Sequence, residues 1–206
     1  MAKSSDTLPV GPLPDLMKWW RKCKVQGAII GGLAVALRGF ARTTLDVDAV
    51  VFIEEAGWPS FLTIGSTYSI ESRIPEPLAF AKEASIFLLS HAPSGVDLDI
   101  TLGQLAYEKL IIRRAVPKKI GKATVPIATV EDLIVLKAVA NRPRDLADIQ
   151  GLLEVNTSID LAYIREQIEE LAAMADLPDA AREFERILTN HLRSVKTKSA
   201  KKGKLR

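Results

Sequence analysis

The chain has 206 residues, of which 48% are hydrophobic, 28 are Lys or Arg and 25 are Asp or Glu, which suits one α/β domain or a domain with a small helical extension. The longest apolar run, residues 28–37, is about half of the ~18 residues that a membrane span needs, and the N-terminus lacks a secretory signal, so we expect a cytoplasmic protein with no membrane partner. Cys23 is the only cysteine, which excludes an intrachain disulfide and a cysteine-based zinc site.

The first quarter of the chain predicts alternating helices and strands. In order, the pattern indicates a disordered segment over 1–12, a helix over 15–24, a strand over 28–30, a helix over 33–40 and a strand over 45–53. Asp15 is a candidate N-cap for the first helix. The pair Gly31-Gly32 joins the first strand to the second helix, where glycine lets the backbone approach a phosphate closely.

Asp46 and Asp48 lie two residues apart on the strand over 45–53, so their side chains share one face, roughly 6.5–7 Å apart. If the two charges approach to about 4–5 Å at an effective dielectric near 20, their repulsion costs roughly 3–4 kcal/mol. A bound cation relieves this repulsion, and Mg²⁺ is the usual partner of hard oxygen ligands beside phosphates. The pair therefore indicates phosphoryl-transfer chemistry.

The middle of the chain predicts two hairpins separated by a helix. The expected elements are a helix near 58–65, a loop that contains Pro75 and Pro77, a strand over 85–89, a turn at 92–95, a strand over 96–100, a helix over 104–114 and a hairpin around 121–122 that ends at 126–128. The strand over 96–100 alternates strictly, so Asp97 and Asp99 also share one face.

The last third of the chain predicts helices only, over 129–140, 144–154, 161–175 and 178–192. Thr129 is a good N-cap, with Asp132 three residues later in a capping-box arrangement. Residues 193–206 form a basic tail that we expect to be disordered. Without the six charges of residues 195–206, 22 basic residues face 25 acidic ones, and the tail is either a solubilising end or a contact for RNA phosphates.

The order strand, glycine pair, helix, Asp-x-Asp strand and later acidic strand resembles the nucleotidyltransferase superfamily, which shares its fold with the palm of DNA polymerase beta. Gly31, Gly32, Asp46 and Asp48 match the first parts of the superfamily motif. The third carboxylate falls in Val96-Asp97-Leu98-Asp99; Asp97 is favoured because bacterial AbiEii-like members typically read Val-Asp-Leu there, and Asp99 is the alternative on the same face.

The resemblance continues through residues 129–137 and 141–149, which look like the downstream Glu-Asp-Leu-Ile…Lys…Arg-Pro…Asp-Leu-x-Asp signature of the bacterial minimal, AbiEii-like nucleotidyltransferases. It covers roughly residues 25–165. It implies an α/β (α+β) fold with a mixed sheet flanked by helices, in which 13–128 form the nucleotidyltransferase core and 129–192 form a helical C-terminal region.

Three further residues have a functional and a structural interpretation. Lys137 shares a helix face with apolar residues and needs an anionic partner, either a nucleotide triphosphate or Asp145 or Asp148 on the next helix. Arg42 and Thr43 precede the aspartate strand, where they either contact phosphate or shape the loop. His91 and His191 are isolated and are expected at the surface, and no Gly-x-Ser-x-Gly or Gly-x-Gly-x-x-Gly motif is present.

The resemblance implies a Mg²⁺-dependent enzyme that moves a nucleoside monophosphate from an NTP to a hydroxyl acceptor. The implied catalytic and metal-binding residues are Asp46, Asp48 and Asp97, and the implied nucleotide-binding residues are Gly31, Gly32, Arg42, Thr43 and Lys137. The acceptor is an RNA 3′ end, such as that of tRNA, or a protein side chain, and a toxin–antitoxin partner protein is expected. The alternative is a non-catalytic nucleotide- or protein-binding module of the same fold.

Overall fold

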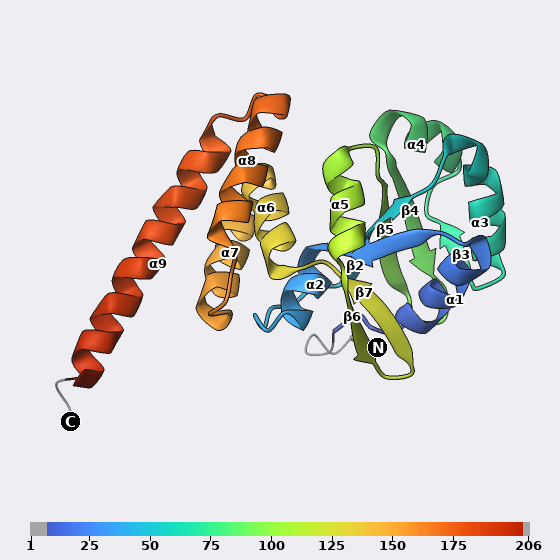
Figure 1. Cartoon of the computed structure of the whole chain (residues 1–206). Helices are drawn as coiled ribbons and strands as arrows, with labels where there is room; N and C mark the ends of the chain where they lie inside the picture. The colour runs from blue at the N-terminus through green and yellow to red at the C-terminus, as the bar shows by residue number, and fades with distance from the viewer. Residues whose placement is uncertain (1–7, 204–206) are drawn as a thin grey trace. The chain divides into compact units, whose positions relative to one another are not determined.

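The computed structural model describes residues 8–203, without the side chains of Lys196 and of residues 198–203. The described chain divides into two compact units (Figure 1). The sheet unit comprises residues 8–37 and 41–129, and the helical unit comprises residues 38–40 and 130–203. The helical unit therefore begins at almost the same residue as the run of helices that the sequence predicts, but it also includes three residues that follow the second helix.

The sheet unit contains the strands and five of the α-helices. Its elements are α1 (Leu13–Cys23), β1 (Gln26–Ile29), α2 (Gly31–Leu37), β2 (Asp46–Phe52), the 3₁₀ turn η1 (Glu55–Gly57), α3 (Trp58–Ser66), β3 (Ile70–Ser72), α4 (Pro77–Ala84), β4 (Ile86–His91), β5 (Val96–Leu102), α5 (Ala106–Arg114), β6 (Val116–Ile120) and β7 (Ala123–Ile127).

The seven strands form one mixed sheet in the order β3-β4-β5-β2-β1-β7-β6. The central strand β2 pairs in parallel with β5 and antiparallel with β1. Helices α2 and α5 pack against β2, α1 packs against β7, and α4 packs against β4 (Figure 1). The mixed sheet flanked by helices that the sequence predicts is therefore confirmed.

The core of the sheet unit forms because the strands alternate in burial. Val47, Ala49 and Val51 of β2 are fully buried, and Leu98 and Ile100 of β5 are fully buried beside them. Burial of such side chains contributes about 1.5–3 kcal/mol for each large aliphatic residue. Asp46 and Asp48 alternate with these residues and point to the opposite face, where they are half-buried, while Val50 further along the same face is 1% exposed.

The sheet unit differs from the sequence prediction in several places; the helix expected over 33–40, for example, is α2 and spans Gly31–Leu37. The segment around Pro75 and Pro77 was expected to be a loop, yet β3 and α4 lie on either side of Pro75. Pro77 is compatible with a helix because it occupies the first turn of α4, where a missing N–H breaks no intrahelical bond. Asp15 does not cap α1, which begins after Pro12; the Asp15 carboxylate instead binds Lys18 and His91.

The helical unit consists of α6 (Val130–Ala140), α7 (Pro143–Val155), α8 (Leu161–Ala175) and α9 (Asp179–Gly203). Its core contains Leu133, Ile149, Ile164 and Phe184, all at most 1% exposed. Helix α9 extends well beyond residue 192, so the prediction of a disordered tail from residue 193 is wrong as far as Gly203; residues 204–206 lie outside the described residues. Basic residues suit the C-terminal end of a helix because they face the negative end of its dipole.

Within the described residues, we find no helix that combines the length and the apolar character needed to cross a bilayer.

Candidate active site

The four aspartates that the sequence singles out lie together on one face of the sheet. In the parallel pairing of β2 with β5, Asp46 is the register partner of Asp97, and Asp48 is the register partner of Asp99. Neighbouring strands are about 4.8 Å apart, and register partners point to the same face. We call these four residues the carboxylate array. Asp97 and Asp99 are both members, so the two candidates for the third carboxylate occupy neighbouring positions.

Each of the two β2 aspartates of the carboxylate array accepts a hydrogen bond. The Thr44 hydroxyl donates to Asp46 Oδ1 at 2.7 Å, and the Gly32 N–H donates to Asp48 Oδ2 at 3.3 Å. Thr44 is only 6% exposed, and its Oγ1 lies 2.7 Å from the position that a Cβ on Gly32 would take. Thr44 therefore links the glycine pair to the aspartates.

Gly31 is required at its position for two reasons. Its φ is +62°, in the left-handed region that side chains disfavour, and a Cβ there would lie 1.9 Å from Asp48 Oδ2. The backbone between β1 and α2 can approach the Asp48 carboxylate this closely only because residue 31 has no side chain. The glycine pair and the Asp-x-Asp strand are thus in direct contact.

The β5 side of the carboxylate array is paired with Arg73, a residue that sequence reasoning missed. Arg73 Nη1 lies 3.2 Å from Asp97 Oδ2, and Arg73 Nη2 contacts Asp99 Oδ1. Burial raises the pKa of the Asp99 carboxyl above its ordinary value; Arg73 opposes this, while Asp46 and Asp97 raise the pKa further. No local pattern marks Arg73 in the sequence, because its partners are 24 and 26 residues further along the chain.

Arg42 lies beside the glycine pair. Its guanidinium carbon is 3.1 Å from the position of a Cβ on Gly32, and its Nε donates to the Thr43 carbonyl oxygen at 3.4 Å. Thr43 itself has an exposed side chain. The structure thus brings Arg42 and Thr43 to the loop that enters β2, next to Gly32, and a phosphate contact by either residue stays a prediction.

Lys137 lies in the helical unit, where it forms an ion cluster with two buried aspartates and an exposed arginine. Its Nζ is 2.7 Å from Asp145 Oδ1 and 3.1 Å from Asp148 Oδ2, and Arg142 Nε is 2.6 Å from Asp145 Oδ2. We call these four residues the α6–α7 brace. The structural interpretation of Lys137 as a brace is therefore confirmed, and its contact with a nucleotide stays a prediction.

The carboxylate array has the donor chemistry of a Mg²⁺ site, since hard carboxylate oxygens from two neighbouring strands face the same side. Its side chains are nevertheless arranged around protein donors: Thr44, the Gly32 N–H and Arg73 each bind a carboxylate. Accordingly, the described residues contain no group of three or more acidic, histidine or cysteine side chains already converged to hold a metal ion. The residues fit the ion by chemistry, and the carboxylates would have to turn toward it.

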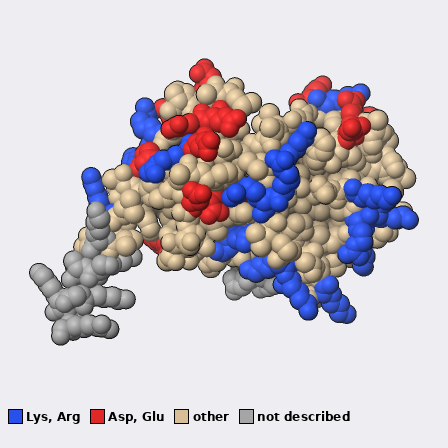
Figure 2. Space-filling model, viewed as in Figure 1, with Lys and Arg blue, Asp and Glu red and all other residues tan. Residues whose placement is uncertain are grey.

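Exposed basic side chains gather on another part of the sheet unit. Figure 2 shows Lys and Arg over α5 and the β6–β7 hairpin. We call this set the basic surface; its exposed members are Lys109, Arg113, Lys118, Lys119 and Lys122. Between residues 106 and 128 the one acidic residue is Glu108, whose carboxylate accepts the N–H groups of Gln104 and Leu105.

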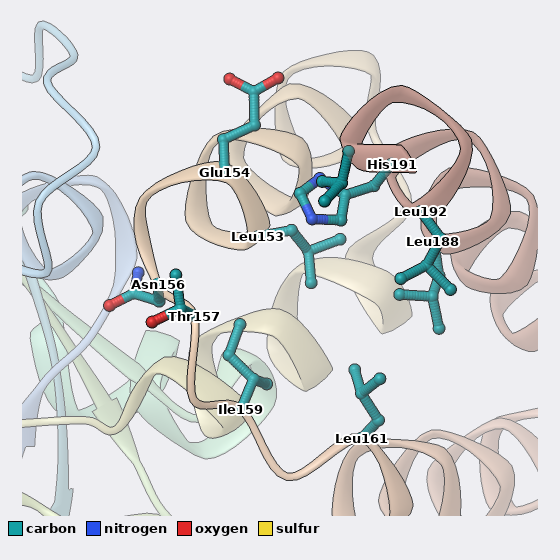
Figure 3. Close-up of a pocket in the computed structure, with 10 residues that line it drawn as sticks. Leu153, Glu154, Asn156, Thr157, Ile159, Leu161, Leu188, His191 and Leu192 are labelled. Carbon is teal, nitrogen blue, oxygen red and sulfur yellow. The ribbon is translucent and has the colours of Figure 1, made fainter. Parts of the chain in front are cut away.

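The helical unit contains a separate cavity of about 320 Å³ (Figure 3). Aliphatic side chains such as Leu153, Ile159, Leu161 and Leu188 form its walls, and His191 lies at its edge with Glu154. None of the residues that line it belongs to the carboxylate array.

The expectation that both histidines lie at the surface fails for His91, which is 3% exposed and lies between Asp15 Oδ2 at 3.3 Å and Ser94 Oγ at 2.8 Å.

Comparison with known proteins gives one family match and several structural matches. Residues 27–203 match the family model described as "Nucleotidyl transferase AbiEii toxin, Type IV TA system". The comparison with curated proteins gave no match.

Two solved structures share the fold. A crystal structure of an antigenic nucleotidyltransferase-like protein from Paracoccidioides brasiliensis aligns with a TM-score of 0.52 at 15% identity, over 83% of this chain and 90% of that one. The solution structure of the antibiotic-resistance factor ANT(2'')-Ia aligns with a TM-score of 0.55 at 15% identity, over 83% of this chain and 95% of that one.

Proposed function

The chain belongs to the AbiEii family of nucleotidyl transferases, and from that premise we propose that it moves a nucleoside monophosphate from an NTP to a hydroxyl acceptor in a Mg²⁺-dependent reaction. The observation that carries the proposal is the register of β2 with β5, which sets Asp46 beside Asp97 and Asp48 beside Asp99. Four carboxylates on one face of a sheet are unfavourable for stability alone, because like charges at neighbouring positions repel each other. A reaction that requires bound cations would account for the four carboxylates.

The residues around the array would position the NTP. Gly31 lets the backbone approach Asp48, the Gly32 N–H contacts the same carboxylate, and Arg42 lies against Gly32, where its guanidinium is suited to a phosphate. Thr43 lies in the same loop, and Lys137 is proposed as a further nucleotide contact. When bound, Mg²⁺ held by Asp46, Asp48 and Asp97 would neutralise charge on the triphosphate and on the attacking oxygen.

In the proposed reaction the acceptor hydroxyl oxygen forms a bond to the α-phosphorus, and the bond from the α-phosphorus to the bridging oxygen of the β-phosphate breaks, which releases pyrophosphate. The hydroxyl proton passes to a carboxylate of the array. Of the two β5 aspartates, Asp97 is the more exposed to an acceptor, with 49% of its side chain accessible against 29% for Asp99. Asp97 is therefore our choice for the base or third ligand, in agreement with the motif.

For the acceptor we favour RNA over a protein side chain. The basic surface supports this choice, because five exposed cations along α5 and the β6–β7 hairpin can follow a phosphate backbone, whereas a protein hydroxyl needs no such surface. The experiment supplies each of the four α-³²P-labelled NTPs to the protein with total cellular RNA and, separately, with cellular protein. We expect labelled RNA, including tRNA, that requires Mg²⁺ and is lost with Asp46→Asn.

Labelled protein instead of RNA would correct the acceptor and leave the reaction class intact. If neither pool is labelled, and Asp46→Asn behaves as the wild type does, the catalytic proposal fails. A non-catalytic binding module of the same fold would take up nucleotide without releasing pyrophosphate, so a pyrophosphate assay in the same reactions separates the two. The matched control is Asp176→Asn, an exposed aspartate at the end of α8, which should label like the wild type.

We further propose that the chain is the toxin of a toxin–antitoxin pair, as the description of its family suggests. Induced expression should arrest growth in a bacterial host, and Asp46→Asn should relieve the arrest at equal protein level. Co-expression of the neighbouring gene should also relieve it. Growth that is unaffected by the active wild-type protein would contradict a toxin role without touching the transferase reaction.

A further inference from the structure

Arg73 is held in place by the edge of the sheet. Strand β3 pairs with β4, with Ser72 opposite Leu89, and the Arg73 N–H continues this pairing by donating to the Leu88 carbonyl oxygen at 2.9 Å. Directly after it, the Ser72 hydroxyl donates to the Ile74 carbonyl oxygen at 2.7 Å and closes a turn. The backbone of Arg73 is therefore fixed, and the direction in which its side chain leaves the strand is fixed with it.

From this position the side chain of Arg73 reaches across β4 to β5. The register places Leu88, which accepts the Arg73 N–H, opposite Asp99, and the next residue but one on β4, Ser90, opposite Asp97, so both aspartates lie one strand beyond β4. The guanidinium gives one nitrogen to each, Nη1 to Asp97 and Nη2 to Asp99. A planar fork can bridge two carboxylates in this way, which the single ammonium of a lysine does less well.

Arg73 consequently supplies positive charge where the family reaction requires a metal ion. Its side chain is 30% exposed, and it contacts one oxygen of each β5 carboxylate. We propose that Arg73 is a resident counter-cation of Asp97 and Asp99 that opposes binding of a free divalent ion to the carboxylate array. This inference rests on the proposed function, in which the same array holds the metal ion. Arg73 acts through the two aspartates and is a positioning residue.

For the loss of Arg73, the proposal predicts a change in metal affinity opposite to the change that a purely structural role would give. Removing a side chain that merely supports the site would weaken metal binding, because the carboxylates would lose their orientation. Removing a competing cation strengthens metal binding, because the ion no longer faces a positive charge a few Å away. Even at the effective dielectric of about 20 found near protein surfaces, a charge at that distance changes the affinity for a divalent ion by a factor of ten or more.

The test measures binding of Mn²⁺ alone, without nucleotide, by calorimetry and by the electron paramagnetic resonance signal of the free ion. We expect Arg73→Gln to bind Mn²⁺ about tenfold or more tightly than the wild type, and Arg73→Lys to lie between the two, because it keeps the charge but bridges the carboxylates less well. The matched control Arg21→Gln removes an exposed arginine of α1 in the same unit and should leave the Mn²⁺ affinity unchanged. Equal or weaker binding by Arg73→Gln would overturn the inference.

A measurement on the wild-type protein keeps the inference testable if Arg73→Gln does not fold. Titration with Mg²⁺ should shift the ¹⁵Nε resonance of Arg73 as the guanidinium leaves the carboxylates, and a resonance that does not move at Mg²⁺ saturation would contradict it. Asp46→Asn separates this outcome from the proposed function. If the wild type and Asp46→Asn bind Mn²⁺ equally weakly, the metal site itself is wrong; if only Arg73→Gln behaves unexpectedly, the role of Arg73 is wrong.

Discussion

The carboxylate array and the α6–α7 brace both gather aspartates, but they balance the charge differently. In the brace, Asp145 and Asp148 are at most 2% exposed and are matched by Lys137 and Arg142. In the array, four half-exposed carboxylates outnumber the arginines described beside them, Arg42 and Arg73. Buried aspartates matched by cations fix two helices against each other, whereas a partly exposed excess of negative charge keeps an affinity for cations. Each region should therefore respond differently to the loss of a charge.

The largest effect on stability is expected in the brace. Lys137→Met leaves Asp145 and Asp148 buried with less compensation, and breaking a buried ion pair from one side costs about 3–5 kcal/mol. Urea unfolding followed by circular dichroism measures this loss. The control Arg165→Met removes one partner of the exposed Arg165–Glu185 pair and should cost no more than about 1 kcal/mol. Equal costs for the two variants would show that the brace is not a structural cluster.

The next effect concerns the backbone beside the array. Gly31→Ala places a side chain in the left-handed region and against Asp48, which we expect to cost roughly 2 kcal/mol or more. Gly121→Ala is the matched control, because Gly121 has φ +57° but nothing within 4 Å of its Cβ position. Gly121→Ala should cost about 1 kcal/mol, which is the cost of a side chain in the left-handed backbone conformation alone. The same unfolding assay compares the two variants. Equal losses of stability would mean that the Asp48 side chain can move away from the added methyl group without cost.

A smaller effect is expected where a neutral group supports a buried acid. The Tyr163 hydroxyl donates to Asp132 Oδ1 at 2.6 Å, and Asp132 is fully buried in the helical unit. Tyr163→Phe should cost about 1.5 kcal/mol, the usual contribution of a hydrogen bond to a charged group. Tyr68→Phe is the control, since no hydrogen bond of the Tyr68 hydroxyl occurs among the described residues. A loss below about 0.5 kcal/mol, the size expected of an ordinary surface substitution, would show that Asp132 is held by its other partners.

The smallest effect is a pH dependence of the brace. Burial would raise the pKa of the Asp145 carboxyl, but hydrogen bonds from Arg142 and Lys137 outweigh it and hold the pKa below its ordinary value. A lowered folded-state pKa contributes stability that is present above the ordinary aspartate value of about 3.9 and is lost as the pH falls through the folded-state pKa. Urea unfolding between about pH 3 and pH 6 should show this loss in the wild type. Asp145→Asn should flatten the profile, and an unchanged slope would contradict it.

Most of the site could be predicted from the sequence because its signals are local. The two-residue spacing of Asp46 and Asp48 fixes a shared strand face, and Gly31-Gly32 marks the turn that approaches it. That Asp97 and Asp99 lie beside them depends on the pairing of β2 with β5, which the family resemblance implied and which no local pattern shows.

The parts that were missed depend on contacts between distant residues. Arg73 follows a three-residue edge strand that is too short to show a periodic pattern, and its partners lie on β5, two strands away in the sheet. Buried His91 contacts Asp15, which is 76 residues away in sequence. Thr44 and Thr43 are equivalent in the sequence, and only the conformation of the loop selects Thr44 as the partner of Asp46.

The most direct test of the central claim is the position of the metal ion in a crystal of the protein soaked with Mn²⁺ and a non-hydrolysable NTP analogue. The claim is that the carboxylate array binds divalent ions against a triphosphate. We expect the anomalous signal of Mn²⁺ between β2 and β5, with Asp46 and Asp48 as ligands and Arg73 withdrawn from Asp97. A bound nucleotide with no ion at the array, or an ion held by other residues, would contradict the account.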